Sequence, residues 1–134
     1  MVYARTGKVL LLKRADDPDF WQSVTGSLLW EETEPRQAAE REMREETGLE
    51  STSSLRDLGI VNRYSILPRW RPRYAPEVRD NTEHAFALEL PAEILITVNP
   101  AEHAGYGWFT FDEAAGKVAS WTNRNVILKL KPKG

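Results

Sequence analysis

Cysteine is absent from this chain of 134 residues, which excludes disulfides, thiolate metal sites and a cysteine nucleophile. No apolar run approaches the roughly 18 residues that a membrane-spanning helix needs, and the first residues lack the pattern of a signal peptide. A chain without cysteine is compatible with a reducing compartment. We therefore expect a cytoplasmic protein without a membrane partner.

A large excess of charge of one sign is also missing. The 18 basic and 20 acidic residues give a formal net charge of −2, so the chain lacks the polybasic character of proteins that bind nucleic acid. Hydrophobic residues make up 41% and charged residues 28%, which is an ordinary globular composition. The length and composition predict one domain over residues 1–134, with a hydrophobic core and no nucleic-acid partner.

The predicted elements alternate between short strands and helices. Strands are expected at residues 8–14, 20–25, 58–67, 84–90 and 106–111, and helices at 35–47, 112–119 and 122–131. Three prolines make residues 68–80 a loop. This order indicates an α/β or α+β fold, a mixed sheet sandwiched between helices. Because only four residues precede a turn at residues 5–7, the first strand is expected to be shortened or missing.

A central helix with a carboxylate face begins at Pro35 and ends before Gly48, two residues that suit these positions. Glu42, Glu45 and Glu46 stand at i, i+3 and i+4, so they share one face. Like charges at these spacings destabilise an isolated helix by roughly 0.2–0.5 kcal/mol per pair, and a bound Mg²⁺ would reverse that penalty. On its own, such a helix is more typical of a solvated surface with Glu–Arg pairs.

The residues around this helix resemble the Nudix box, G-x5-E-x7-R-E-U-x-E-E-x-G-U, in which U is a bulky apolar residue. The box spans approximately residues 26–49, and its matching positions are Gly26, Glu32, Arg41, Glu42, Met43, Glu45, Glu46, Gly48 and Leu49. Eight residues separate Glu32 from Arg41, where the pattern has seven. We place the surplus residue at Glu34, where an insertion leaves the helix phase unchanged. Thr33 or Glu34 is then an alternative to Glu32 in tying the loop to the helix.

The resemblance implies a Nudix hydrolase, an enzyme that uses Mg²⁺, with Mn²⁺ as an alternative metal, to hydrolyse the phosphate chain of a small organic triphosphate. It implies Glu45, Glu42 and Arg41 as catalytic residues and Glu42, Glu46, Glu45 and Glu102 as metal ligands. Glu45 is either a further ligand or a base acting through water, and Arg41 orients a carboxylate by a salt bridge. For Glu102 the alternative is an exposed loop carboxylate.

Further segments resemble the dihydroneopterin triphosphate pyrophosphatases, Nudix enzymes of folate synthesis. These segments are Arg14–Gly26, Arg73–Pro76, Asn81–Glu83, Glu102–His103 and Ser120–Arg124. The resemblance implies hydrolysis of dihydroneopterin triphosphate to dihydroneopterin monophosphate and pyrophosphate. One alternative is a hydrolase of (deoxy)nucleoside triphosphates or oxidised nucleotides, because pterin and guanine present similar edges. Another is a Nudix-fold binding module without catalytic activity.

Substrate binding needs a cation for the phosphates and a flat pocket for the pterin. Arg14 at a strand end can reach phosphate through two hydrogen bonds, and apolar or aromatic walls suit the ring. For Trp21 the alternative is core packing, and for Ser120 it is a cap or turn before a helix. A monomer or weak homodimer is expected, with a small-molecule triphosphate as partner. The expected substrate-binding residues are Arg14, Trp21, Thr25, Tyr64, Ser65, Ile66, Leu67 and Ser120.

Overall fold

The fold is known from a computed structural model that describes residues 1–17, 19–24, 35–49, 55–65 and 80–131. The helices are α1 (Pro35–Thr47), α2 (Phe111–Lys117) and α3 (Trp121–Leu130). None of them is long and apolar enough to cross a membrane, a finding that holds for the described ranges. The strands are β1 (Val2–Ala4), β2 (Lys8–Arg14), β3 (Trp21–Gln22), β4 (Arg56–Ser65), β5 (Asp80–Leu90) and β6 (His103–Thr110).

The strands form one mixed sheet. Six strands of the described chain take part, in the order β3-β2-β1-β5-β4, with β6 paired to β2. The pairing of β1 with β5 is parallel, and the other pairings are antiparallel. A first strand is therefore present, although it has only three residues.

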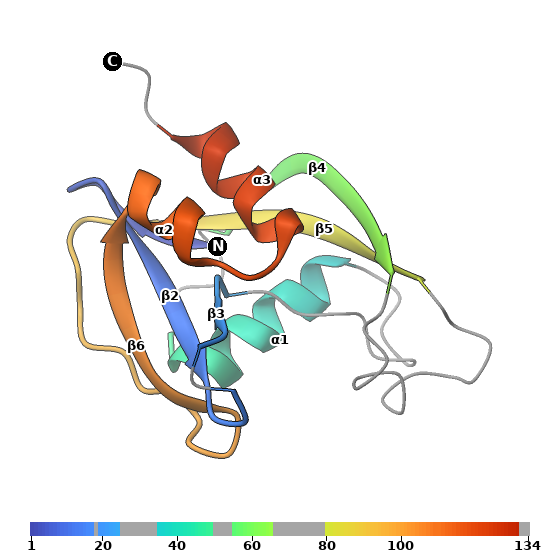
Figure 1. The fold of residues 1–134 in the computed structure, drawn as a ribbon. Coiled ribbons are helices and arrows are strands. Elements are labelled where there is room, and N and C mark those ends of the chain that lie inside the picture. The colour runs from blue at the N-terminus through green and yellow to red at the C-terminus, as the bar shows by residue number, and fades with distance from the viewer. Residues whose placement is uncertain (18, 25–34, 50–54, 66–79, 132–134) are drawn as a thin grey trace.

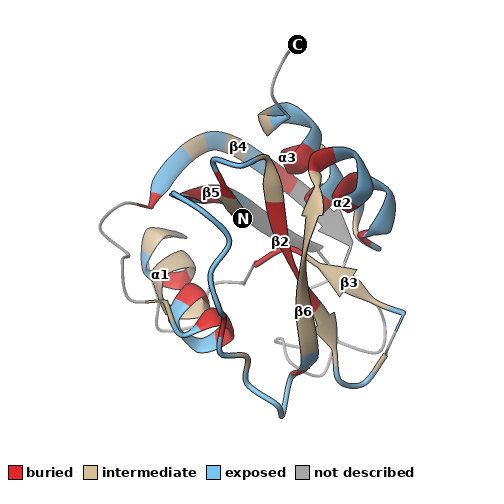
Figure 2. Ribbon diagram, turned by 90° about the vertical axis from the view of Figure 1, so that its left-hand side faces the viewer, coloured by how far each residue is buried: buried red, intermediate tan, exposed pale blue. Residues whose placement is uncertain are grey.

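Strand β2 separates two hydrophobic clusters, because successive side chains of a strand point to opposite faces of the sheet. Val9 and Leu11 pack with residues of α2 and α3 in one cluster. Leu10 and Leu12 pack with Met43 of α1 in the other. All four β2 side chains are fully buried, and Figure 2 shows the buried stretch along this strand.

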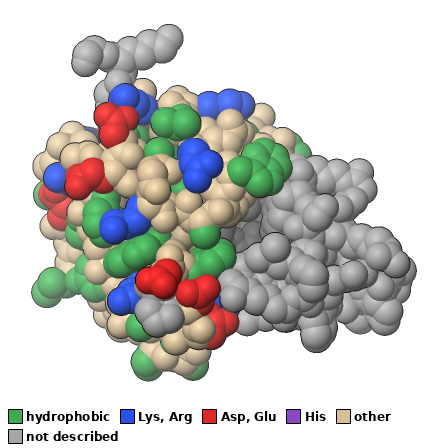
Figure 3. All heavy atoms as spheres, in the orientation of Figure 1, with side chains coloured by type: hydrophobic (Ala, Val, Ile, Leu, Met, Phe, Trp, Pro, Cys, Tyr) green, Lys and Arg blue, Asp and Glu red, His purple; other side chains and the backbone are tan. Residues whose placement is uncertain are grey.

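The helices accordingly cover both faces of the sheet, with α1 on one side and α2 and α3 on the other (Figure 1). The prediction of a mixed sheet sandwiched between helices is confirmed. On the face shown in Figure 3, the described acidic and basic side chains are interspersed.

Several predicted boundaries of strands and helices were wrong, because strand pairing and helix capping determine where these elements begin and end. The strand expected at 20–25 has only two paired residues within the described chain, Trp21 and Gln22. Strand β5 begins at Asp80, in the expected loop, because Asp80 pairs with Ser65 of β4. Phe111 belongs to α2 and not to β6, because Thr110 caps the helix and forms a capping box with Glu113.

The remaining helices and β4 differ from expectation by one or two residues. Helix α2 ends at Lys117 and not at residue 119, and α3 begins one residue before the expected position. Strand β4 begins at Arg56, two residues early, because its first residue pairs with Ala87 of β5. Residues 68–79 of the expected loop lie outside the described residues.

Helix α1 has the predicted bounds, and its end is fixed by Gly48. The backbone of Gly48 has a φ of 74°, in the left-handed region, and its N–H donates to the carbonyl of Arg44 at 3.0 Å. The adjoining residue Thr47 accepts a backbone hydrogen bond from Thr97 at 3.1 Å. This termination keeps the last turn of α1, which carries Glu45 and Glu46, against the segment that contains Thr97.

We predict that Gly48→Ala destabilises the protein by about 1–2 kcal/mol, because an L-residue is strained in the left-handed region. Its Cβ would also lie 3.3 Å from the Cβ of Thr97. Gly116→Ala is the matched control, because Gly116 lies in α2 and an added Cβ meets no atom within 4 Å. The control should gain up to about 1 kcal/mol from helix propensity. Urea unfolding measures both changes, and equal stability of the two variants would contradict this account.

Candidate active site

The three glutamates predicted to share a face of α1 differ in their surroundings. Glu42 and Glu45 both accept a hydrogen bond from Nη1 of Arg41, at 2.6 and 3.0 Å. The side chain of Glu42 is 16% exposed and that of Glu45 is 52% exposed. Arg41 therefore lies where the prediction put it, joined by salt bridges to two of the carboxylates.

Glu46 is buried, with only 4% of its surface exposed, and its Oε2 has no hydrogen-bond partner among the described residues. Burial raises the pKa of Glu46 well above 4.5, and so do the charge of Glu42, a hydrogen bond with Glu42 and the charge of Glu102. Burial likewise raises the pKa of Glu42, although Arg41 opposes this shift. Both carboxyl groups therefore hold a proton to a higher pH than a free glutamate does, and a divalent cation could replace that proton.

This pair fits a hard divalent cation, which binds carboxylate oxygens and offsets their mutual repulsion. The orphaned Oε2 of Glu46 is the observation that supports the fit. Within the described part of the chain, no group of three or more His, Asp or Glu side chains is already arranged to hold a metal ion. A cation held by Glu42 and Glu46 would take its remaining ligands from other oxygens, such as substrate phosphates and water, as Mg²⁺ does.

Glu102 lies at the turn before β6, close enough to Glu46 for their charges to interact. Its backbone N–H donates to Asn99 at 3.0 Å, and its carbonyl accepts from Ala15 at 2.9 Å. These bonds hold the turn against the end of β2. Glu102 is exposed, as the loop alternative states, and its charge is within electrostatic range of Glu46, which is compatible with a metal role.

Arg14, the predicted phosphate ligand, lies at the end of β2 on the α1 face of the sheet. Arg14 comes two residues after Leu12 in the strand, so the two side chains point to the same face of the sheet. The register between β2 and β6 shifts after Lys13, so that Arg14 lies opposite His103 and Ala104 is the extra residue. A β-bulge changes the direction in which a side chain points. This bulge places the His103 side chain on the same face of the sheet as Arg14.

Trp21, a predicted part of the pterin wall, faces the other side of the sheet. Its ring packs edge-on against Phe109 with centroids 5.3 Å apart, and Lys117 Nζ lies 5.4 Å from the Trp21 ring centroid. Trp21 is partly buried against the cluster beneath α2 and α3. These contacts are those of the core-packing alternative, and a substrate contact by Trp21 remains a prediction.

Ser120 caps helix α3, and its hydroxyl accepts a hydrogen bond from the backbone N–H of Thr122 at 3.2 Å. Ser120 is therefore the N-cap of α3, and a substrate contact by Ser120 remains a prediction. Tyr64 and Ser65 lie in β4, where their backbones pair with Asn81 and Asp80. The other predicted substrate residues, Thr25, Ile66 and Leu67, lie outside the described residues, as do Gly26 and the segment that contains the surplus residue.

Sequence reasoning missed two polar contacts, and one of them involves His103, the residue after Glu102. Nε2 of Gln22 and Nε2 of His103 lie 3.2 Å apart across β2, and His103 is buried. The buried amide of Asn123 on α3 accepts a hydrogen bond from the backbone N–H of Ser23 at 3.0 Å. The second contact joins residues 100 positions apart, so no local pattern could have indicated it.

The fold and the paired carboxylates of α1 agree with the family that the sequence predicts. The chain belongs to the NUDIX-domain family, whose model matches residues 1–130. The predicted family is thereby confirmed, and so is the family's fold.

Comparison with known proteins shows which members of this family the chain is similar to. The chain is 44% identical over 131 residues to the dihydroneopterin triphosphate diphosphatase of Escherichia coli K12, covering 95% of this chain and 85% of that protein. It is 36% identical over 133 residues to the Haemophilus influenzae protein of the same name, with coverages of 96% and 82%. The solved structure of the E. coli dihydroneopterin triphosphate pyrophosphohydrolase matches with a TM-score of 0.87 and 43% identity, covering 97% of this chain and 90% of that chain.

The raised pKa of Glu46 predicts how stability depends on pH in the cation-free protein. Above pH 4.5 the unfolded chain releases the proton that folded Glu46 keeps, so stability should fall as pH rises through the raised pKa. Glu46→Gln should remove most of this slope. Urea unfolding in a chelator at several pH values measures it. Glu45→Gln, at an exposed position, is the control that should keep the slope, and an unchanged slope in Glu46→Gln would contradict the assignment.

Proposed function

We propose that this protein is a Nudix hydrolase that converts dihydroneopterin triphosphate and water to dihydroneopterin monophosphate and pyrophosphate. The observation that carries the proposal is the 44% identity, over 95% of the chain, to an enzyme named for this substrate. The site supports it, because the buried carboxylate of Glu46 and the partly buried carboxylate of Glu42 suit a cation that binds a phosphate chain.

We infer that Glu42, Glu46 and Glu102 hold the metal, with Mg²⁺ as the natural ion and Mn²⁺ as its substitute. When bound, the metal would neutralise phosphate charge and activate water. Glu45 is the most exposed of the α1 carboxylates, and it would accept a proton from the attacking water or serve as a further ligand. Arg41 fixes the orientation of both Glu42 and Glu45 through its two hydrogen bonds.

The substrate-binding residues remain proposals. Arg14 would contact phosphate, since its side chain lies on the α1 face beside the turn that carries Glu102. The pterin would be bound by residues from three segments of the chain, namely Trp21, Thr25, Tyr64, Ser65, Ile66, Leu67 and Ser120. We also propose a cytoplasmic location and a monomer or weak homodimer.

The test is the release of pyrophosphate from dihydroneopterin triphosphate and from dGTP at saturating Mg²⁺. We expect kcat/KM to favour the pterin by at least about tenfold, because a pocket built for one edge leaves polar groups unpaired with another. In Glu46→Gln, kcat should fall at least about a hundredfold for both substrates, because the cation loses a charged ligand.

Glu40→Gln is the matched control, because it removes the same charge from α1 at a residue that pairs with Arg36 and not with the site. It should retain the activity of the unmodified protein. Preference for dGTP would indicate a nucleotide hydrolase, and the absence of any pyrophosphate release would indicate a binding module. Near-full activity of Glu46→Gln would contradict the site assignment.

A further inference from the structure

The guanidinium group of Arg14 is engaged by a carboxylate that no family motif assigned to the site. Nε of Arg14 donates to Oδ1 of Asp16 at 2.8 Å, and Nη2 donates to Oδ2 at 3.0 Å. The Arg14 side chain is 11% exposed, whereas that of Asp16 is 55% exposed. A bidentate contact of this kind fixes the relative orientation of the guanidinium and carboxylate groups as well as the distance between them.

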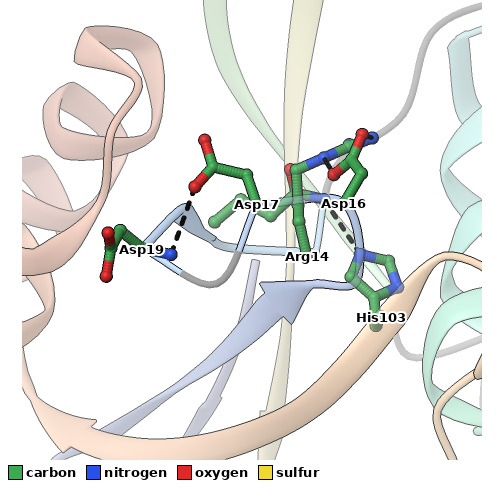
Figure 4. A network of polar contacts seen from close by, with 6 residues as sticks. Arg14, Asp16, Asp17, Asp19 and His103 are labelled. Atoms are coloured by element: carbon green, nitrogen blue, oxygen red, sulfur yellow. Dashed lines mark hydrogen bonds and ion pairs between the residues drawn. The ribbon is translucent and has the colours of Figure 1, made fainter.

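The surroundings of Arg14 contain the acidic residues of the proposed metal site. Ala15, next to Arg14, donates its backbone N–H to the carbonyl of Glu102 at 2.9 Å. The hydrogen bond with Asp16 raises the pKa of Arg14 most, and the charges of Glu102 and Glu46 raise it further. Both glutamates are therefore within electrostatic range of the guanidinium group. Figure 4 shows Asp16 and His103 beside Arg14.

The loop that carries Asp16 is closed by hydrogen bonds. The N–H of Arg14 donates to the carbonyl of Phe20 at 3.0 Å, and the N–H of Phe20 donates to that of Asp17 at 3.0 Å. Asp17 also accepts a hydrogen bond from the N–H of Asp19 at 3.2 Å. The Phe20 ring lies 5.9 Å from Cζ of Arg14. Asp16 is thus held at a defined position relative to the guanidinium group.

We propose that Asp16 is a positioning residue for the metal site, which holds Arg14 so that the carboxylates of Glu46 and Glu102 remain available to a divalent cation. A largely buried cation needs an anionic partner. If Asp16 lost its charge, the guanidinium would pair with the remaining carboxylates nearby and compete with the metal for the same oxygens. The inference rests on the metal site of the proposed function.

The test is Mn²⁺ binding to the full chain without substrate, measured from the electron paramagnetic resonance signal of unbound Mn²⁺. Asp16→Asn should weaken the affinity by about tenfold, which corresponds to about 1.4 kcal/mol. Asp16→Glu keeps a carboxylate in the pair and should restore much of the affinity. Asp19→Asn is the matched control, because its carboxylate belongs to the same loop but points away from Arg14 in Figure 4. It should bind Mn²⁺ normally.

A double-mutant cycle separates competition by Arg14 from a general loss of negative charge. If Arg14 competes, Asp16→Asn should have little effect when it is made in a background of Arg14→Gln. An undiminished effect in that background, or unchanged affinity of Asp16→Asn alone, would overturn the proposal. Circular dichroism and thermal unfolding confirm that each variant is folded. Failure of the unmodified protein to bind Mn²⁺ would instead contradict the metal site itself, and with it the role of Asp16.

Discussion

The buried carboxyl group of Glu46, beside that of Glu42, is the constraint on which the site depends. Within the part of the chain that the structure describes, its Oε2 has no hydrogen-bond partner, and burial together with the charge of Glu42 raises its pKa. Such a group costs stability unless a proton or a cation compensates it. The fold sustains this cost because Met43 anchors α1 in the core and Gly48 ends the helix in the left-handed region. Stability and the proposed metal binding would therefore be linked through the Glu46 side chain.

Strand β2 carries Arg14 at its end and connects this residue to the core. Its alternating leucines bury both faces of the sheet, and the same alternation puts Arg14 on the α1 face. The extra residue in β6 then brings His103 opposite Arg14, and the turn with Glu102 bonds to the residue after Arg14. Acidic and basic groups from elements far apart in sequence thus meet at one end of β2.

The sequence predicted the features that depend on local pattern. Helix α1 has the expected bounds because proline and glycine mark its ends, and helical periodicity alone placed its three glutamates on one face. Glu102 was indicated only by resemblance, since its position beside Glu46 depends on the pairing of β2 with β6. The burial of Glu46 could not be read from a charged helix sequence, because neighbouring elements determine it. Asp16 stands two residues after Arg14, yet only the folded loop shows that the two side chains pair.

A cation bound at Glu46 and Glu42 would replace a proton that these carboxyl groups hold to a higher pH than a free glutamate does, and proton release on metal binding tests this directly. Calorimetric titration with Mn²⁺ in buffers of different ionisation enthalpy counts the protons released. At a pH between 4.5 and the raised pKa of Glu46, we expect release of about one proton per bound ion, and much less from Glu46→Gln. Metal binding without proton release, or equal release from the variant, would contradict it.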